Sequence, residues 1–451
     1  MSKTKSLGIW SLIALVVGNM IGSGIFLLPS ALAHIGTISL VGWICTAIGA
    51  MFIALVFARL ASNYPMAGGP YAYAKEAYGE FIGFQVAFNY WCGLWIGNAA
   101  IAVAFTGYLS FFFPALKSHH IYGFLTSAGA LWAVTLVNMS SVKNAGGLQI
   151  ISTILKLIPL LLIGFVGIFF IHPHNLFDHA NLIVQTKHPV SAFAAISAAA
   201  MMTMWAFIGL EGATVPAQHV KNPKKLIPRA TIIGTSITAV VYILSATAIM
   251  GILPIHELAQ SASPYADAGK LLFGNWMGII VAGCAVISTL GALNGWVMLH
   301  AQVPYAVAQD NLFPKVFGKL SKRDTPVNGL IISGILATAV MALNFQQSLV
   351  SQFEFVIMLA TLAGLIPYLY CTLAELLIVR KYMTKGTKSG YIIGIIAFLY
   401  ICWAIMSAGK EIIYLGMGLM IISLAVYAWI KINPMEELKK KEKFPWNDSF
   451  D

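Results

Sequence analysis

Apolar stretches long enough to cross a lipid bilayer recur along this entire chain. A helix needs about 20 apolar residues to cross the roughly 30 Å hydrocarbon core. Charged residues make up only 10% of the sequence, against about 25% in ordinary soluble domains. The pattern predicts an all-α membrane protein with 12 transmembrane helices. We expect the spans at residues 7–32, 38–62, 81–113, 121–139, 147–171, 190–217, 226–253, 271–307, 327–344, 352–379, 389–407 and 412–431.

The distribution of basic residues sets the orientation of these spans. Lysine and arginine are concentrated on the cytoplasmic side of membrane proteins. With the N-terminus in the cytoplasm, 22 of the 27 lysines and arginines fall on that side. The sequence therefore predicts cytoplasmic tails at 1–6 and 432–451. The net charge of +11 needs no nucleic-acid partner, and the run KKKEK near the C-terminus suits anionic lipid. The residues left on the outer side are Lys117, Lys187, Lys270 and Lys410.

Two of the expected spans are interrupted near their centres. The stretch GNMIGSGIFLLP, residues 18–29, puts Gly22, Ser23 and Gly24 at the centre of the first span, although each glycine costs a helix about 1 kcal/mol. Five spans later, WAFIGLEGAT, residues 205–214, interrupts the sixth span with glycines around Glu211. Paired interruptions in corresponding positions of two halves indicate a transporter binding site.

The spacing of the two breaks predicts the organisation of the chain. Since five is an odd number of spans, the second half is inverted relative to the first. We expect a five-plus-five inverted repeat with broken helices 1 and 6. The repeats cover about 7–171 and 190–380 and form a ten-helix core at 7–380, with two peripheral helices at 381–431.

Broken helices inside a membrane expose backbone groups that need polar partners. The half-helix after the first break offers N–H donors and partial positive charge at Ser23 and Gly24, which suits a carboxylate. Carbonyls near Met20 and at 205–208 can accept hydrogen bonds from an ammonium. An α-amino acid carries both groups. The alternative is that the glycines only allow close helix packing, but two breaks five spans apart favour the binding site.

Several motifs give the chain a family resemblance. They are GNMIGSGIFLLP, AGGPYAYAKEAYG (67–79), YWCGLWIGN (90–98), WAFIGLEG (205–212), VKNPKKLIPRATI (220–232), SATAIMGILP (245–254) and IPYLY (366–370). The chain resembles the amino acid–polyamine–organocation (APC) superfamily and, within it, the basic amino acid/polyamine antiporters of the arginine/agmatine type. The resemblance implies a LeuT-like fold, exchange by alternating access, no cofactor and, in many members, a homodimer.

The resemblance also implies roles for single residues. The amides of Ser23 and Gly24 would hold the substrate carboxylate. The carbonyls of Met20, Trp205 and Ile208 would take the α-ammonium, and the Trp205 ring would close over the substrate. The other implied residues are Asn19 lining the pocket, Trp296 stacking on a distal cation, Asn98 at the distal end, and Glu211 and Tyr368 in the inner gate.

Four positions depart from the arginine-transporting members. Ala360 stands where a pocket serine is expected, and Phe84 replaces an inner-gate tyrosine. Gly93 and Leu94 replace the two residues whose carbonyls line the distal end of the pocket. A lost hydroxyl leaves a buried donor less well satisfied, at a cost of about 1–3 kcal/mol. The substrate class is therefore left open between cationic and neutral amino acids.

Ionisable residues inside membrane spans are usually functional. Lys156 lies within the fifth span, as a lysine does in proton-coupled relatives and in the eukaryotic light-chain exchangers. The resemblance implies that its ammonium replaces a sodium ion, which predicts sodium independence; a lysine that reaches the membrane surface is the alternative. Glu211 is either a gating or coupling carboxylate or a helix breaker. His300, one turn after Trp296, is either a packing residue or a proton carrier.

Other protein classes fit the sequence less well. An enzyme would need a motif such as HExxH or a nucleophile and base, and a channel would need a filter loop. The five cysteines form no CxxC or Cys/His cluster, so we expect no disulfide and no metal. A sensor on a transporter fold stays open. We expect a bacterial inner-membrane antiporter that exchanges an arginine-like cationic amino acid for a related amino acid or amine. A sodium-independent carrier of neutral amino acids, proton-coupled or exchanging, is the alternative.

Overall fold

The structure is a computed structural model that describes residues 8–22, 24–63, 69–140, 160–184, 190–214, 217, 220, 222–382 and 388–442. Every regular element within these residues is a helix, and most of these helices lie in an expected span. In the first half these are α1 (Ile9–Met20), α2 (Gly24–Ala33), α3 (Ser39–Asn63), α4 (Pro70–Tyr78), α5 (Glu80–Leu109), α6 (Ala115–Ser118), α7 (His120–Ser140), η1 (Leu162–Val166), η2 (Gly167–Phe170), α9 (Pro173–Phe177) and α10 (His179–Leu182).

The second half repeats the use of long helices joined by short ones. Its elements are α11 (Ala192–Met204), η3 (Trp205–Phe207), η4 (Leu210–Thr214), α12 (Pro223–Ile252), α13 (Ile255–Gln260), α14 (Pro264–Phe273), α15 (Asn275–Gln309), α16 (Val327–Leu343), α17 (Leu349–Tyr382), α18 (Lys388–Met406) and α19 (Lys410–Glu442).

Nine helical segments in the described part of the chain are long and apolar enough to cross a membrane, and α16 and most of α18 form two shorter apolar helices. Each coincides with an expected span to within a few residues. The first and sixth spans are α1 with α2 and α11 with η3 and η4, so the expected interruptions are present. Most of the fifth span, 147–171, lies outside the described residues. The count of twelve spans and the inverted repeat stay predictions.

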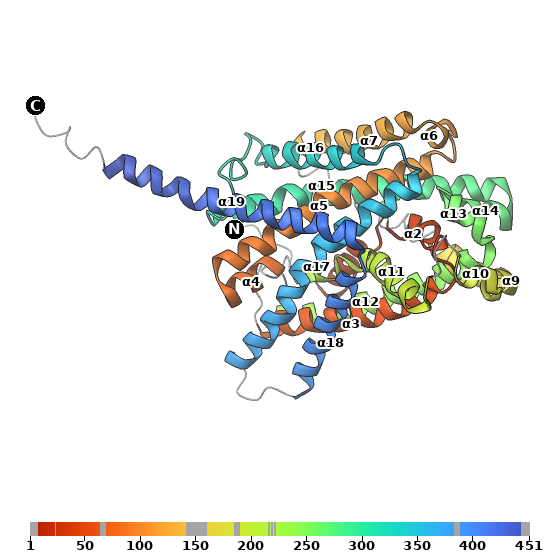
Figure 1. The fold of residues 1–451 in the computed structure, drawn as a ribbon, viewed down its shortest axis with the longest axis horizontal. Coiled ribbons are helices and arrows are strands. Elements are labelled where there is room, and N and C mark those ends of the chain that lie inside the picture. The colour runs from red at the N-terminus through yellow and green to blue at the C-terminus, as the bar shows by residue number, and fades with distance from the viewer. Residues whose placement is uncertain are drawn as a thin grey trace, which may run out of the picture.

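The long helices form one bundle with short helices at its two ends. The extensive contacts of α5 are with α17 and α15, and α3 packs on α12 and α11. Figure 1 shows α7 and α16 along one flank of the α5 and α15 pair, with α3 on the opposite flank. Helix α4 lies at one end of the bundle, and α6, α9, α10, α13 and α14 lie at the other. The end of α19 projects beyond the bundle on the α4 side.

The outward faces of the bundle are apolar. Ile48 on α3, Leu136 on α7, Val240 on α12 and Ile279 on α15 are each about half exposed. In water such a belt would be costly, since it leaves apolar surface uncovered. Lipid covers it in a membrane protein. The interior between the long helices is where the two interrupted spans meet.

Candidate functional site

The first break is a tight backbone turn between α1 and α2. Ile21 has φ −73° and ψ 82°, close to an inverse γ-turn, and the Gly22 N–H donates to the Met20 carbonyl at 2.7 Å. Helix α2 then begins at Gly24. The α1 ladder therefore stops at Met20, as the glycines predict. Ser23 lies outside the described residues.

The second break follows a short 3₁₀ turn, η3. Ile208 is extended with ψ 130°, and Gly209 has φ +107°, a region that only glycine adopts without strain. The chain then resumes as η4. Gly209 is therefore required by the geometry of the break.

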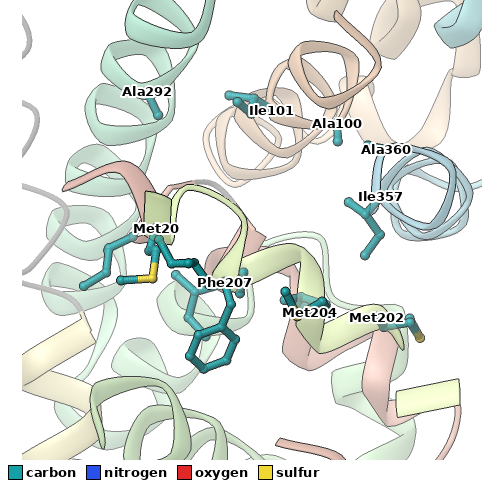
Figure 2. Packing of buried hydrophobic residues seen from close by; sticks show 14 of the residues in the cluster. Met20, Ala100, Ile101, Met202, Met204, Phe207, Ala292, Ile357 and Ala360 are labelled. Carbon is teal, nitrogen blue, oxygen red and sulfur yellow. The ribbon is translucent and has the colours of Figure 1, made fainter. Parts of the chain in front are cut away.

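The two breaks lie against each other. Asn19 on α1 packs directly on Gly209 and Gly212, because a Cβ atom at either glycine would meet the Asn19 side chain or backbone. Figure 2 shows Met20 and Phe207 lying close together at this point. Backbone from both interrupted spans thus converges in the interior of the bundle.

A cavity opens where the breaks face α5, α15 and α17. Most of its wall is backbone or apolar side chain, and no charged residue is among the described residues that line it. It is lined by Asn19, Met20, Gly22, Gly24, Tyr90, Gly93, Leu94, Gly97, Ile101, Trp205, Ala206, Ile208, Trp296, Ala360 and Gly364. A mostly apolar hollow with a few polar groups is the usual form of a small-molecule site.

Two indole rings form part of this wall. Trp205 lies between two glycines, since a Cβ at Gly24 would be 2.6 Å from its Cδ1 and a Cβ at Gly97 would be 2.6 Å from its Cη2. The ring therefore spans the distance from the first turn of α2 to α5. Trp296 lines the cavity from α15. Both rings are placed to contact a molecule in the cavity.

A buried carboxylate with three donors lies beside the cavity. Glu211 accepts a hydrogen bond from the Tyr90 hydroxyl at 2.8 Å and from the Gly209 N–H at 3.1 Å. It also accepts one from the Tyr368 hydroxyl, which itself accepts from the Gly209 N–H. Glu211 and Tyr368 are fully buried. The carboxylate thus connects the second break to α5 and α17.

This cluster lies on the α4 side of the cavity. Tyr368 is one turn beyond the wall residue Gly364 toward the end of α17, where Cys371 contacts the Pro70 carbonyl at the start of α4. Tyr90 is on α5, which starts beside α4. The hydrogen bonds of Glu211 therefore join three segments between the cavity and one end of the bundle.

Comparison with known proteins identifies the chain's family. A family model described as amino acid permease matches residues 7–411. The chain belongs to the amino acid permease family. It is 32% identical over 443 residues to the Escherichia coli putrescine transporter PotE, covering 98% of this chain and 99% of that one. It is 37% identical to the E. coli cadaverine/lysine antiporter over 345 residues, 76% of each chain. It is 34% identical to PotE of Haemophilus influenzae, over 95% and 98% of the two chains.

These matches confirm the resemblance to the APC superfamily and its basic amino acid/polyamine antiporters. The permease is a multi-pass membrane protein, as its apolar helices and bacterial relatives both indicate. The matched relatives are named as transporters and an antiporter rather than as enzymes.

The structure brings most of the expected substrate residues of the permease together. Asn19, Met20, Gly24, Gly93, Leu94, Trp205, Ile208, Trp296 and Ala360 all line the cavity. Asn98 is not among the lining residues. Its Nδ2 lies 2.9 Å from Nδ1 of His300 on α15, and both side chains are fully buried. The structure thus pairs two residues for which the sequence suggested separate roles.

Phe84 and Lys156 were also expected to take part in gating or coupling. The Phe84 ring packs on Phe88, Phe313 and Tyr427, with centroids 5.1–5.8 Å apart. Lys156 lies outside the described residues. The roles of both stay predictions.

Sequence reasoning missed several residues of the site. Tyr90 binds Glu211, and Gly97, Ile101, Ala206 and Gly364 line the cavity. Helical spacing could have identified most of them. Tyr90, Gly97 and Ile101 lie three or four residues from the predicted Gly93 and Leu94 or from each other along α5, so they share one face of that helix.

Proposed function

We propose that this permease is an antiporter that exchanges a cationic amino acid for a related amino acid or amine by alternating access. The observation that carries the proposal is the cavity between the two breaks, with an indole from each of two helices on its wall. It operates in the bacterial inner membrane with both termini in the cytoplasm, the orientation favoured by the basic residues.

The end of the cavity at the breaks suits the backbone end of an amino acid. The first turn of α2 at Gly24 offers N–H donors to a carboxylate. Met20, Trp205 and Ile208 border the same cavity, and their backbone carbonyls would suit an ammonium. A decarboxylated amine would use the carbonyls alone, which allows an amino acid and its amine product to share one site.

The far end of the cavity favours a primary amine over a guanidinium. Trp296 can stack on either cation, gaining up to about 2 kcal/mol. An ammonium, however, has three donors to satisfy, whereas a guanidinium has five in a fixed fork. Because Gly93, Leu94 and Ala360 offer no side-chain acceptor to either group, a guanidinium would leave more donors unpaired. Lysine or ornithine with its diamine is therefore the preferred pair, and arginine with agmatine is second. The relatives named for putrescine and for cadaverine and lysine support the same order.

The absence of a charged side chain from the described cavity wall favours a second candidate. A neutral aliphatic amino acid would fill the space beside Ala360 and Trp296 without needing a distal counter-charge. In this version the permease carries neutral amino acids, independently of sodium, with Lys156 in the place of the ion.

The Glu211 cluster is proposed as the inner gate. It lies between the cavity and the α4 end of the bundle, which is the cytoplasmic end in the proposed orientation. Breaking the hydrogen bonds from Tyr90 and Tyr368 would free α5 and α17 to separate from the second break. This would open the cavity to the cytoplasm.

The deciding experiment is counterflow in proteoliposomes containing the purified permease. The vesicles are loaded with unlabelled lysine, given trace labelled lysine, and challenged with cadaverine, ornithine, putrescine, arginine, agmatine, leucine and alanine. Label accumulation that only cationic compounds inhibit supports the proposal. No counterflow of labelled lysine, together with counterflow of labelled leucine or alanine in vesicles loaded with the same neutral amino acid, would replace it by the neutral carrier. Binding without flux for every compound would indicate a sensor.

A Trp296→Leu variant sharpens this test. Loss of the indole should weaken the binding of cationic substrates by up to roughly 30-fold, the equivalent of about 2 kcal/mol. The binding of neutral competitors should change much less. Equal loss for both classes would mean that the ring only fills space. Gly283→Ala on α15 is the control, because nothing lies within 4 Å of the added Cβ.

A further inference from the structure

A single tyrosine connects the two breaks. Tyr242 on α12 is fully buried, and its hydroxyl donates to the Met20 carbonyl at 2.6 Å and to the Ala206 carbonyl at 3.1 Å. The first acceptor belongs to the break between α1 and α2, and the second to η3. One phenol hydrogen is thus shared between two segments far apart in sequence.

Both acceptors are carbonyls that lose their helical partner at a break. In a continuous helix the Met20 carbonyl would accept from residue 24 and the Ala206 carbonyl from residue 210. The turn at Ile21 gives Met20 a replacement donor in the Gly22 N–H, and the Tyr242 hydroxyl donates to the Ala206 carbonyl. Because unpaired backbone groups are costly inside a membrane, the Tyr242 hydroxyl stabilises both turns.

The ring of Tyr242 is fixed by its neighbours. Its centroid lies 5.3 Å from that of Trp43 on α3 and 5.5 Å from that of Phe207 in η3. The hydroxyl is therefore held in place by packing on α3 and η3. Tyr242 is not among the residues that line the cavity, whereas Met20 and Ala206 are, so it can act on a substrate only through the backbone that it holds.

We propose that Tyr242 is a positioning residue that joins the two breaks into one unit and fixes the mutual geometry of the carbonyls at the ammonium end of the cavity. The inference rests on the proposed function for what the carbonyls bind. The inference goes beyond the proposed function because it names a residue outside the cavity on which substrate binding depends. Tyr242 therefore affects the binding of the ammonium group that all the substrates share. The far end of the cavity still selects between substrate side chains.

Two measurements on Tyr242→Phe test this, because phenylalanine keeps the ring and removes only the hydroxyl. The first is hydrogen–deuterium exchange of the purified permease, followed in peptides covering 17–25 and 203–212. The second is the KM and maximal rate of exchange for lysine, ornithine and arginine. Tyr73→Phe is the control, since the fully buried Tyr73 hydroxyl on α4 has no hydrogen-bond partner among the described residues.

We expect backbone exchange in Tyr242→Phe to rise in both segments together and KM to rise by the same factor for each substrate, roughly 3- to 10-fold. The maximal rate should change little, and Tyr73→Phe should match the unmodified protein. Unchanged exchange, or a rise in one segment alone, would overturn the proposal. So would a lower maximal rate with an unchanged KM. If the unmodified permease transports none of these compounds, the proposed function fails, and the exchange rates still decide the role of Tyr242.

Discussion

The Trp205 ring gives the sharpest prediction, because it fits end to end between two helices. Replacing Gly97 by alanine would put a Cβ 2.6 Å from Cη2 of the ring, whereas carbon atoms pack at about 3.5–4.0 Å. The ring would have to move by roughly 1 Å. Gly24 prevents that movement, because the other end of the ring, at Cδ1 and Nε1, already fills the space where its Cβ would be.

The misfit between an alanine at position 97 and the Trp205 ring should lower transport activity. Overpacking a filled interior costs about 1–3 kcal/mol, which corresponds to a factor of roughly 5 to 150 in an equilibrium constant. We expect Gly97→Ala to lower counterflow efficiency within that range in proteoliposomes containing equal amounts of folded protein. Gly283→Ala, which adds the same methyl group to α15 in open space, should keep full activity.

A double variant separates the steric effect from a general loss of folding. Phenylalanine lacks the part of the indole that would meet the new methyl group. Trp205→Phe combined with Gly97→Ala should therefore be no worse than Trp205→Phe alone. The reasoning would be refuted if Gly97→Ala were as active as Gly283→Ala, or if the losses from the two substitutions simply added.

Three further outcomes are expected. Tyr90→Phe should destabilise the closed gate by about 1–3 kcal/mol, because it removes one donor to the buried Glu211 carboxylate; unchanged hydrogen–deuterium exchange in peptides covering 205–214 would contradict this. Arg59→Met should cost up to about 3–5 kcal/mol, because Glu375 at 2.6 Å is 1% exposed, and the double variant Arg59→Met/Glu375→Leu should unfold at a higher temperature than the single one. Asp310→Asn should lower thermal stability by less than about 1 kcal/mol, equally from pH 5 to pH 8.

The pH independence of the last effect follows from the direction of the pKa shift. Partial burial acts to raise the pKa of Asp310, but hydrogen bonds from Lys75 and Tyr71 outweigh it, so the pKa lies below its ordinary value of 3.8. An acid with a lowered pKa contributes its stability above the unfolded pKa and loses it only as pH falls through the folded one. A stability difference that changed between pH 5 and pH 8 would contradict this assignment.

The broken spans were predictable from sequence, whereas the face that each unbroken helix turns toward the cavity was not. Glycines at 22, 24, 209 and 212 identify the two breaks without reference to any other residue. Helix α5, by contrast, is buried on nearly every side, so its hydrophobic pattern does not indicate which face borders a cavity. For that reason the hydrophobic pattern alone reveals neither Tyr90, which only its spacing from Gly93 and Leu94 indicates, nor the contact between Asn98 and His300.

The same limit applies to the aromatic residues. Phe84 was expected in the gate because it stands in the place of a gate tyrosine of the family that the chain resembles, and the structure surrounds it with rings from α5, α19 and the loop after α15. A motif identifies a position along the chain, and only the packing of neighbouring helices fixes the direction of the side chain. The hydrogen bond from Tyr90 to the Glu211 carboxylate depends on such packing as well.

The sharing of one carboxylate by three segments has a consequence for the kinetics of opening. Glu211 takes donors from α5, from α17 and from the turn that contains it. A small outward tilt of either helix would leave a buried oxygen or hydroxyl unpaired while the cavity was still too narrow to admit water. Intermediate positions are therefore high in free energy, so the opening should be a cooperative two-state transition with sparsely populated intermediates.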